Sequence, residues 1–261
     1  MPTEPPPELV HALQHSRAQA FTHDVVMDAI DLSMAFERHV LLYGLEGLFL
    51  LETDEASWRL PPSRIAWVPA GTMVKATTIK EVRCTSLFFR PDFANDVSPV
   101  FRVFPGSPVI REMIKHARRW TVKTHEPDEE IERFFRTLLD LCRNALRTHR
   151  QLSLPKAQSE ELAKALSYAQ EHLGDPIRLE DAARAAAMSP RTLMRRLNVE
   201  IHMTFGQYLQ QARMIRAMEH LARGMQVTET AFEVGYQSVP AFSTAFRKLT
   251  DMTPTEYRAQ F

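Results

Sequence analysis

Cysteine is scarce in this chain of 261 residues, which contains only Cys84 and Cys142. The two lie far apart, and neither belongs to a CxxC pair or to a cluster with histidine. A disulfide framework and a cysteine-based zinc site are therefore not indicated. We expect both residues to be buried, reduced thiols.

Long apolar runs and a net charge are missing as well. No segment reaches the roughly 18 consecutive apolar residues that a membrane span needs. The start, MPTEPPPELV, lacks the basic and then apolar pattern of a signal peptide, so a cytoplasmic protein without a membrane partner is expected. The 32 Lys plus Arg balance 32 Asp plus Glu, and no global positive field indicates a nucleic-acid partner. Any binding of DNA has to come from a local arrangement of side chains.

The first part of the chain is predicted to be a β domain. Residues 2–8 contain four prolines and two glutamates, and we expect 1–22 to be a flexible lead-in. From 24 to 90, short apolar runs lie between Gly, Pro, Asp and Ser residues, which is typical of strands and turns. The clearest runs are 47–53, 64–70 and 82–89. The pattern predicts a small antiparallel sandwich or barrel.

Over 109–148 the spacing of apolar residues becomes helical. Two helices are expected, at about 109–122 and 128–148. The second carries a wide apolar stripe, which consists of Ile131, Phe134, Phe135, Leu138, Leu141, Cys142 and Ala145. Such a stripe either packs against the sheet or forms a dimer interface, and the sequence leaves both open.

A domain boundary is expected where a proline and polar residues separate two helical patterns. The segment is QLSLPKAQSE, at 151–160. It divides a first domain at 23–150 from an all-helical second domain at 161–261. The predicted fold class is therefore α+β, with the strands and two helices in the first domain.

The stretch 178–199 has the layout of a helix-turn-helix. A short alanine-rich helix is followed by a second helix, for which Ser189 is a good N-cap and Pro190 suits the first helical position. The second helix of such a unit enters the major groove of DNA. Its outer face carries arginines, which can hold the O6 and N7 of guanine or grip phosphates. One such unit alone is equally typical of a solvated helix face.

The pattern recurs over 227–250, after one long helix. Here Thr228 is expected to cap a short helix, Gly235 to make the turn and Ser238 to cap the second helix. Two such units could reach successive major grooves about 34 Å apart. The candidate DNA-binding residues of the two second helices are Ser189, Arg191, Thr192, Met194, Arg195, Arg196, Ser238, Val239, Ser243, Thr244, Arg247 and Lys248. We expect the first unit to supply most base-specific hydrogen bonds and the second to grip phosphates.

From about Ala163 to Arg258 the chain resembles the DNA-binding domain of AraC/XylS transcription regulators. The resemblance is strongest in GYQSVPAFSTAFRKLTDMTPTEYR, where a turn glycine, capping serine, paired phenylalanines, basic pair and final TP..YR occur in order. It implies a domain of seven helices and a bacterial regulator that activates or represses promoters, with double-stranded DNA and RNA polymerase as partners. His202 and Asp251 stand where the family commonly has glycine, and both types tolerate a left-handed backbone.

The run WRLPPSRIAWVPAGT, at 58–72, is similar to part of the cupin-like domain of many such regulators. The resemblance implies a sensing or dimerisation domain, with a small-molecule effector or a homodimer. Metal-binding cupins use an HxH pair, a carboxylate and a later histidine. This sequence has no HxH, His39 stands alone, and Val74 occupies the later position, so no metal or other cofactor is expected. An apolar effector pocket has as candidates Phe49, Trp58, Trp67 and Phe88, although each of them is more typical of plain core.

The sequence thus predicts a sequence-specific DNA-binding regulator without enzymatic activity, modulated by an effector. One alternative is a cupin-type enzyme with a helical appendage, against which the missing metal ligands argue. Another is a DNA-repair methyltransferase fused to an AraC-type domain. That enzyme needs a reactive cysteine in a specific motif, and neither Cys84 nor Cys142 has such a setting.

Overall fold

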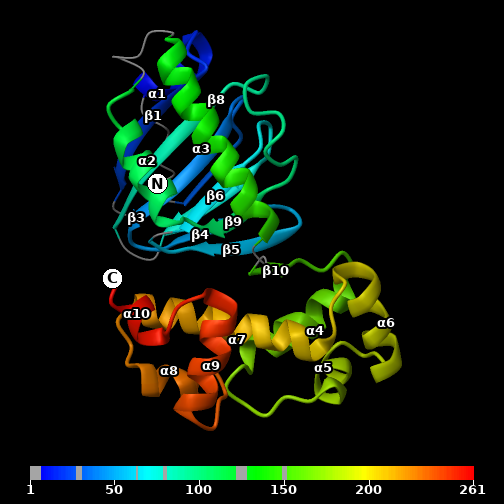
Figure 1. Ribbon diagram of the computed structural model, residues 1–261. Coiled ribbons are helices and arrows are strands. Elements are labelled where there is room, and N and C mark those ends of the chain that lie inside the picture. Colours follow the sequence, from blue (N-terminus) through cyan, green and yellow to red (C-terminus); the bar gives the residue numbers. More distant parts are fainter. Residues whose placement is uncertain (1–6, 28–30, 63, 79–80, 122–127, 149–151) are drawn as a thin grey trace. The chain divides into compact units, whose positions relative to one another are not determined.

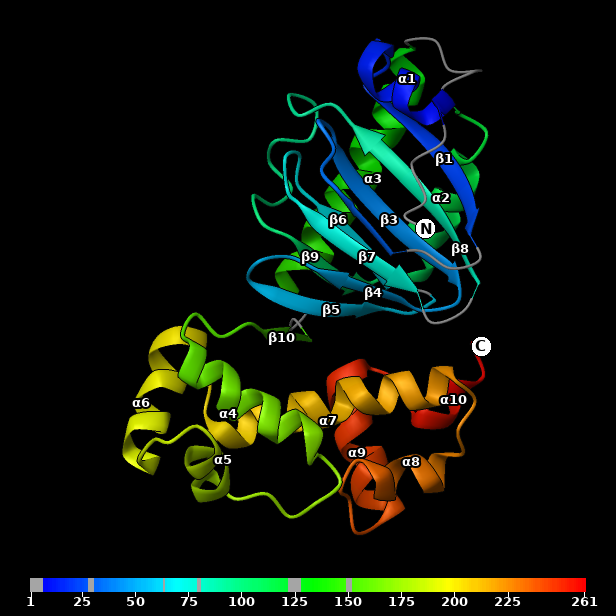
Figure 2. The same cartoon turned by 180° about the vertical axis from the view of Figure 1, so that it is seen from behind.

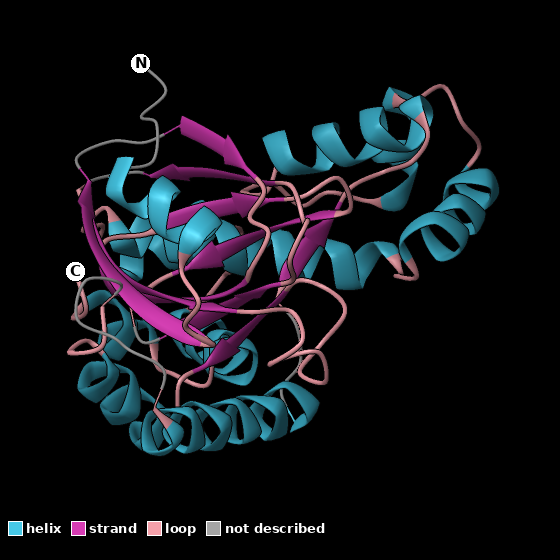
Figure 3. Ribbon diagram, turned by 90° about the horizontal axis from the view of Figure 1, so that it is seen from above, coloured by secondary structure: helices cyan, strands magenta, loops and turns pink. Residues whose placement is uncertain are grey.

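The computed structural model describes residues 7–27, 31–62, 64–78, 81–121, 128–148 and 152–261. The chain separates into two compact units, of which the first comprises Met1–Thr53 and Arg59–Gln151 and the second Asp54–Trp58 and Leu152–Phe261. Strands dominate the first unit and helices the second. Figure 3 distinguishes the two kinds of element by colour. The predicted α+β class, with a helical second domain, is confirmed. No helix within the described ranges is long and apolar enough to cross a membrane.

The strands form two antiparallel sheets (Figures 1 and 2). The first has the order β1-β8-β3-β6-β9 and consists of β1 (Ala20–Met27), β8 (Val82–Phe89), β3 (His39–Glu46), β6 (Arg64–Val68) and β9 (Arg102–Pro105). The second has the order β10-β5-β4-β7-β2 and consists of β10 (Ser153–Pro155), β5 (Ala56–Leu60), β4 (Phe49–Glu52), β7 (Val74–Thr78) and β2 (Asp31–Met34). The three clearest apolar runs of the sequence correspond to β4, β6 and β8. Two antiparallel sheets are the architecture expected of a cupin-like domain.

One face of the first sheet is covered by two helices, α2 (Pro108–Ala117) and α3 (Glu129–Thr148), as Figure 1 shows. Strand residues alternate between the two faces of a sheet. Alternate apolar residues of β3, β6 and β8 therefore pack against the helices, and the main members of this core are Leu41, Tyr43, Ile65, Trp67, Leu87, Phe89, Phe135, Leu138 and Cys142. Packing against the sheet thus accounts for the buried part of the predicted apolar stripe on α3.

The start of the chain differs from the flexible lead-in expected over 1–22. Helix α1 covers Pro7–His15, and β1 begins at Ala20. The connecting segment is fixed by Arg38, whose guanidinium donates to the carbonyl oxygens of Ser16 at 2.6 Å and Ala18 at 2.9 Å. The proline content indicated disorder only for the first few residues, and residues 1–6 lie outside the described part. A contact made by a residue from beyond the segment could not be seen in its composition.

The second unit contains seven helices within the described residues, as the family resemblance implied. They are α4 (Glu160–Glu171), α5 (Leu179–Ala185), α6 (Pro190–Ile201), α7 (Phe205–Ala222), α8 (Val227–Glu233), α9 (Val239–Thr250) and α10 (Pro254–Arg258). The central helix α7 contacts α4 on one side and α8 and α10 on the other (Figure 1). It therefore joins a first half, α4–α6, to a second half, α8–α10.

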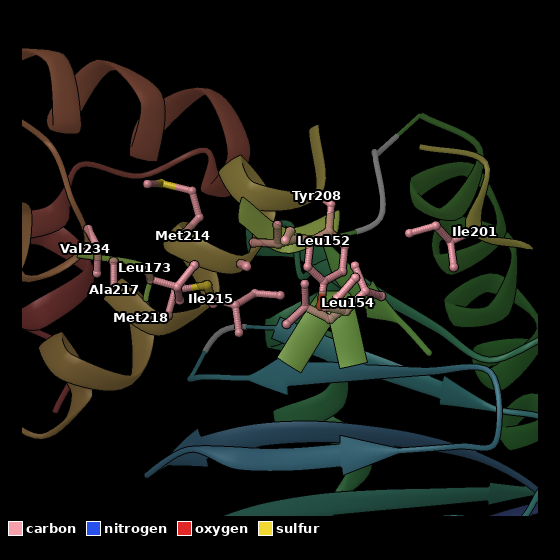
Figure 4. Packing of buried hydrophobic residues seen from close by; sticks show 14 of the residues in the cluster. Leu152, Leu154, Leu173, Ile201, Tyr208, Met214, Ile215, Ala217, Met218 and Val234 are labelled. Carbon is pink, nitrogen blue, oxygen red and sulfur yellow. The ribbon is translucent and has the colours of Figure 1, made fainter. Parts of the chain in front are cut away.

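The segment expected as a linker, 151–160, contains structure of its own. Ser153–Pro155 form β10, which pairs with β5 of the segment Asp54–Trp58 in the same unit. Leu152 and Leu154 are buried in the helical core, where Figure 4 shows them beside Tyr208. The sequence did not indicate burial of these two leucines, because a proline and polar residues surround them. Residue 151 lies outside the described ranges.

Candidate nucleic-acid interface

The first helix-turn-helix unit consists of α5 and α6. Ser189 caps α6, because its hydroxyl accepts a hydrogen bond from the Thr192 backbone N–H at 3.1 Å. The turn before it depends on Ala187, which has a φ of 52°. The sequence placed this connection at Met188 and Ser189 and missed the left-handed residue, because alanine carries no signal for that conformation. At the other end of α6, His202 adopts the left-handed conformation expected of it, with a φ of 54°.

The two faces of α6 differ sharply. Leu193, Leu197 and Ile201 are buried in the core of the unit. Arg191 and Arg195 are exposed on the other side, together with Met194, and Thr192 is half-buried. Neither Arg191 nor Arg195 makes a hydrogen bond or ion pair with any residue that the structure describes. Their guanidinium groups are therefore available to an external ligand.

Arg196 does not join these two arginines. Its Nη1 lies 3.3 Å from the Glu200 carboxylate and 3.4 Å from that of Glu161. Burial alone would raise the pKa of Glu200, but hydrogen bonds from Ser159, Gln158 and Arg196 hold it below its usual value. Arg196 thus belongs to a network that ties α6 to the start of α4. The glutamate four residues after it was the available sequence signal.

The second helix-turn-helix unit consists of α8 and α9. The expected cap at Thr228 is wrong, because α8 begins at Val227 after Gln226, which makes no side-chain cap. Gly235 makes the turn with a φ of +81°. Ser238 caps α9 as expected, since its hydroxyl accepts from the Ala241 N–H at 3.4 Å. Asp251 ends α9 in the left-handed conformation that the sequence indicated, at a φ of 64°.

The outer face of α9 is basic at its C-terminal end. Phe242 and Phe246 are fully buried, whereas Arg247 and Lys248 are exposed. Thr244 is exposed too, but its hydroxyl donates to the Pro240 carbonyl at 2.9 Å. Of the remaining candidates on this helix, Ser238 is exposed and Val239 and Ser243 are half-buried.

The four candidate effector residues are all buried, and they do not share one lining. Trp67 packs with Phe89 in the core between the first sheet and its helices. Phe88, the residue before Phe89, points to the opposite face, where its ring contacts Phe21 at 5.2 Å and Phe36 at 5.4 Å. Trp67 and Phe88 therefore cannot face the same cavity. The other two, Phe49 and Trp58, lie on β4 and β5.

His39 has a structural role. Its Nδ1 accepts the Ala70 backbone N–H at 2.9 Å, and its ring stacks on Trp67 at 5.1 Å. Within the described residues, no group of three His, Cys, Asp or Glu side chains is placed to hold a metal ion. Cys84 and Cys142 are buried as expected, and burial raises the pKa of each thiol to about 12.

The stability of the β-rich first compact unit is expected to fall on acidification because of His39. Burial lowers the pKa of His39, while a hydrogen bond to the Pro91 backbone opposes that shift. The folded state therefore binds a proton less readily than the unfolded chain. The contribution of neutral His39 is complete above the unfolded pKa of about 6.5 and is lost as pH falls below it. Protonation would also end acceptance of the Ala70 N–H.

Thermal melting of the full chain between pH 7.5 and 5.5 measures this effect. His39→Gln should flatten the dependence of the melting temperature on pH relative to wild type. An identical pH dependence in wild type and His39→Gln would assign the acid sensitivity to other groups.

Known proteins resemble this chain, either over the two helix-turn-helix units or over most of its length. A family model described as a helix-turn-helix domain matches residues 182–260, which contain α6 and α9. The HTH-type transcriptional regulator NimR of Escherichia coli (strain K12) is 28% identical over 221 residues, which are 84% of this chain and 79% of NimR. Regulatory protein SoxS of the same strain is 30% identical over 94 residues, or 36% of this chain and 88% of SoxS. A solved transcriptional regulator of Chromobacterium violaceum, described as having an AraC-type DNA-binding domain, is 27% identical, with 38% of this chain and 90% of that chain covered and a TM-score of 0.37.

The chain has two helix-turn-helix units, and the second helix of each carries exposed basic side chains. A transcription regulator matches most of its length. These features define a DNA-binding transcription regulator. NimR is described as a transcriptional regulator and SoxS as a regulatory protein. The chain belongs to the AraC/XylS family of transcription regulators.

Proposed function

We propose that this regulator reads two successive major grooves of one duplex, with α6 as the base-reading helix and α9 as the helix that grips phosphates. The observation that carries the proposal is the pair Arg191 and Arg195, exposed on α6 without an intramolecular partner among the described residues. They are four residues apart and so lie on one helix face. Each guanidinium can make two hydrogen bonds to a guanine. Met194, at 53% exposure, supplies an apolar contact for a thymine methyl.

The side chains of α9 support a different role. Its first turn presents Val239, Pro240 and Ala241, which have no side-chain hydrogen-bonding groups, and the Thr244 hydroxyl already has an acceptor. The exposed cations, Arg247 and Lys248, follow in the later turns. Cations without neighbouring base-reading groups suit phosphates, which fix the register of a protein on DNA.

The length of the central helix α7 supports binding in two successive grooves. It has 18 residues, which corresponds to a length of about 27 Å. Successive major grooves on one side of a duplex are about 34 Å apart. A monomer therefore spans two grooves when α6 and α9 lie on the same side of the second unit.

Genome-wide mapping of bound DNA tests the proposed function most directly. The expected result is a site with two conserved elements about 10 base pairs apart, in front of the regulated genes. A site with one short element only would contradict the two-groove arrangement. Mapped sites also supply the duplex for every binding experiment below.

Lys248→Ala is expected to weaken binding to all duplexes by a similar factor, because a phosphate contact carries no base information. The slope of log affinity against log salt concentration should fall by about one ion. Fluorescence anisotropy at several salt concentrations measures both quantities. Lys164→Ala is the control, since Lys164 is an exposed lysine of α4 that pairs with Glu160 at 2.7 Å. A Lys248→Ala slope equal to that of wild type would remove Lys248 from the phosphate contacts.

The proposal includes three further partners. We infer that the first unit binds a small-molecule effector, that the chain acts with RNA polymerase in the bacterial cytoplasm, and that exposed parts of α2 and α3 contribute to a homodimer. The two-sheet architecture of the first unit and the family membership support these assignments. Sedimentation equilibrium of the full chain tests the dimer, and an effector screen by thermal shift tests the ligand.

A further inference from the structure

Arg213, in the middle of α7, is hydrogen-bonded to the backbone that follows the C-terminal end of α4. Its Nε donates to the Leu173 carbonyl at 3.1 Å and its Nη2 donates to the Asp175 carbonyl at 3.1 Å. These carbonyls belong to the turn between α4 and α5. Burial lowers the pKa of Arg213, with nearby Tyr236 opposing the shift. The guanidinium is therefore partly withdrawn from water and is committed to holding this turn.

The backbone of the second half approaches the same turn closely. A Cβ on Gly235 would lie 2.5 Å from the Leu173 carbonyl oxygen and 2.8 Å from Arg213 Nη2. A Cβ on Gly174 would lie 2.9 Å from the Glu233 carbonyl oxygen. Real Cβ atoms do not come this close to other atoms, so glycine is required on both sides. The two turns thus meet backbone against backbone.

We call the meeting point of the two turns the junction, and it consists of Leu173–Asp175, Arg213 and Gly235. Both α6 and α9 are connected to it. On the second side, Tyr236 follows Gly235, and its ring contacts Phe242 of α9 edge-on at 5.6 Å. On the first side, the turn joins α4 to α5, and both of these helices contact α6. The junction therefore constrains α6 and α9 together, although it touches neither outer face.

We propose that Arg213 is a positioning residue that fixes the angle between α6 and α9 and thereby sets the spacing of the two DNA elements that the protein accepts. The inference rests on the proposed two-groove binding. An added base pair moves the second element by about 3.4 Å along the axis and turns it by about a tenth of a full rotation. A rigid junction cannot follow that displacement, whereas a loosened one can. Arg213 thus acts on DNA selection without contacting DNA.

The experiment compares affinities of the full chain for duplexes that carry both elements at the mapped spacing, at one base pair more or less, and for a duplex with one element. Gly174→Ala places a methyl group between the two turns, and Arg213→Lys keeps the charge but loses the two-carbonyl fork. Gly206→Ala and Arg216→Lys are the matched controls. Gly206 has open space around its Cβ position, and Arg216 lies on α7 beside Glu219 at 3.9 Å.

Wild type and both controls should lose about tenfold in affinity for each change in spacing. For Gly174→Ala and Arg213→Lys we expect the loss of affinity per change in spacing to fall below about threefold. The reason is that a loosened junction weakens binding at the mapped spacing but lets the protein adjust to the altered spacings. Single-element affinity should stay within about twofold of wild type, which shows that α6 is intact. If one of these two variants loses single-element affinity, the comparison uses the other of the two.

Two results separate the inference from the proposed function. If wild type binds the single-element duplex as tightly as the two-element duplex, reading of two grooves is wrong. If wild type discriminates between spacings and Arg213→Lys, with intact single-element binding, discriminates to the same extent, Arg213 does not set the spacing.

Discussion

Arg195→Ala is expected to weaken binding to the mapped site strongly at physiological salt. The loss of one two-bond guanine contact costs about 1 to 3 kcal/mol, which is roughly 5- to 150-fold in affinity. Affinity for unrelated DNA should fall much less, since Arg195 would contribute there only as one cation. The side chain is exposed and has no partner among the described residues, so its removal leaves the fold intact. Anisotropy titrations with specific and scrambled duplexes measure the difference.

The control for this change is Arg216→Ala, which removes an exposed arginine from α7. It should leave both affinities close to those of wild type. The decisive readout for Arg195→Ala is a relaxed preference at one base position, measured with a set of single-base variants of the site. Retained affinity together with retained base preference would show that α6 does not read DNA through Arg195.

Phe246→Ala is expected to destabilise the helical second compact unit by about 3 to 5 kcal/mol, as truncations of buried aromatic residues do. Phe246 is completely buried on α9, where its ring contacts Phe242 at 5.6 Å and Tyr257 at 5.4 Å. The loss leaves a cavity at the point where α9 meets α10. Against a total of about 5 to 15 kcal/mol for an ordinary domain, it removes a large share of the stability.

Calorimetry of the full chain tests this prediction, with Phe232→Ala as the control. Phe232 lies on α8 in the same half of the unit but is 53% exposed, so its truncation should change stability by less than about 0.5 kcal/mol. DNA binding by Phe246→Ala should weaken at temperatures where the control still binds fully. Equal melting of the two variants would mean that the core around α9 relaxes to fill the space.

The sequence was sufficient for the architecture of the reading helices because their signals are local. Ser189 before Pro190 starts α6, Ser238 starts α9, and His202 ends α6 with the backbone conformation expected of it. Each of these features depends on a residue and its nearest neighbours along the chain. The β-strands around 64–70 and 82–89 were predictable for the same reason, since apolar runs bounded by turn residues report directly on buried strands.

Features that depend on distant contacts were not predictable. Arg196 is adjacent to Arg195 and of the same type. Glu200, four residues later, indicated one partner, but the second partner, Glu161, comes from another helix. The segment between α1 and β1 is held by Arg38, which comes some twenty residues later. For the effector candidates, aromatic composition could not say which face of the sheet each ring occupies, and Trp67 and Phe88 face opposite ways.

The strand β10 bears on how this regulator can be divided. Leu152 and Leu154 contribute side chains to the helical core, and the strand that pairs with β10 comes from residues 56–58, about a hundred positions earlier. A fragment cut at the polar stretch before α4 would lack both leucines, and one cut just ahead of Leu152 would keep them but leave the β10 edge uncovered. A C-terminal piece made for a gene fusion or a domain exchange should therefore begin no later than Leu152, because that start keeps both leucines in the helical core and gives up only the pairing of β10 with β5.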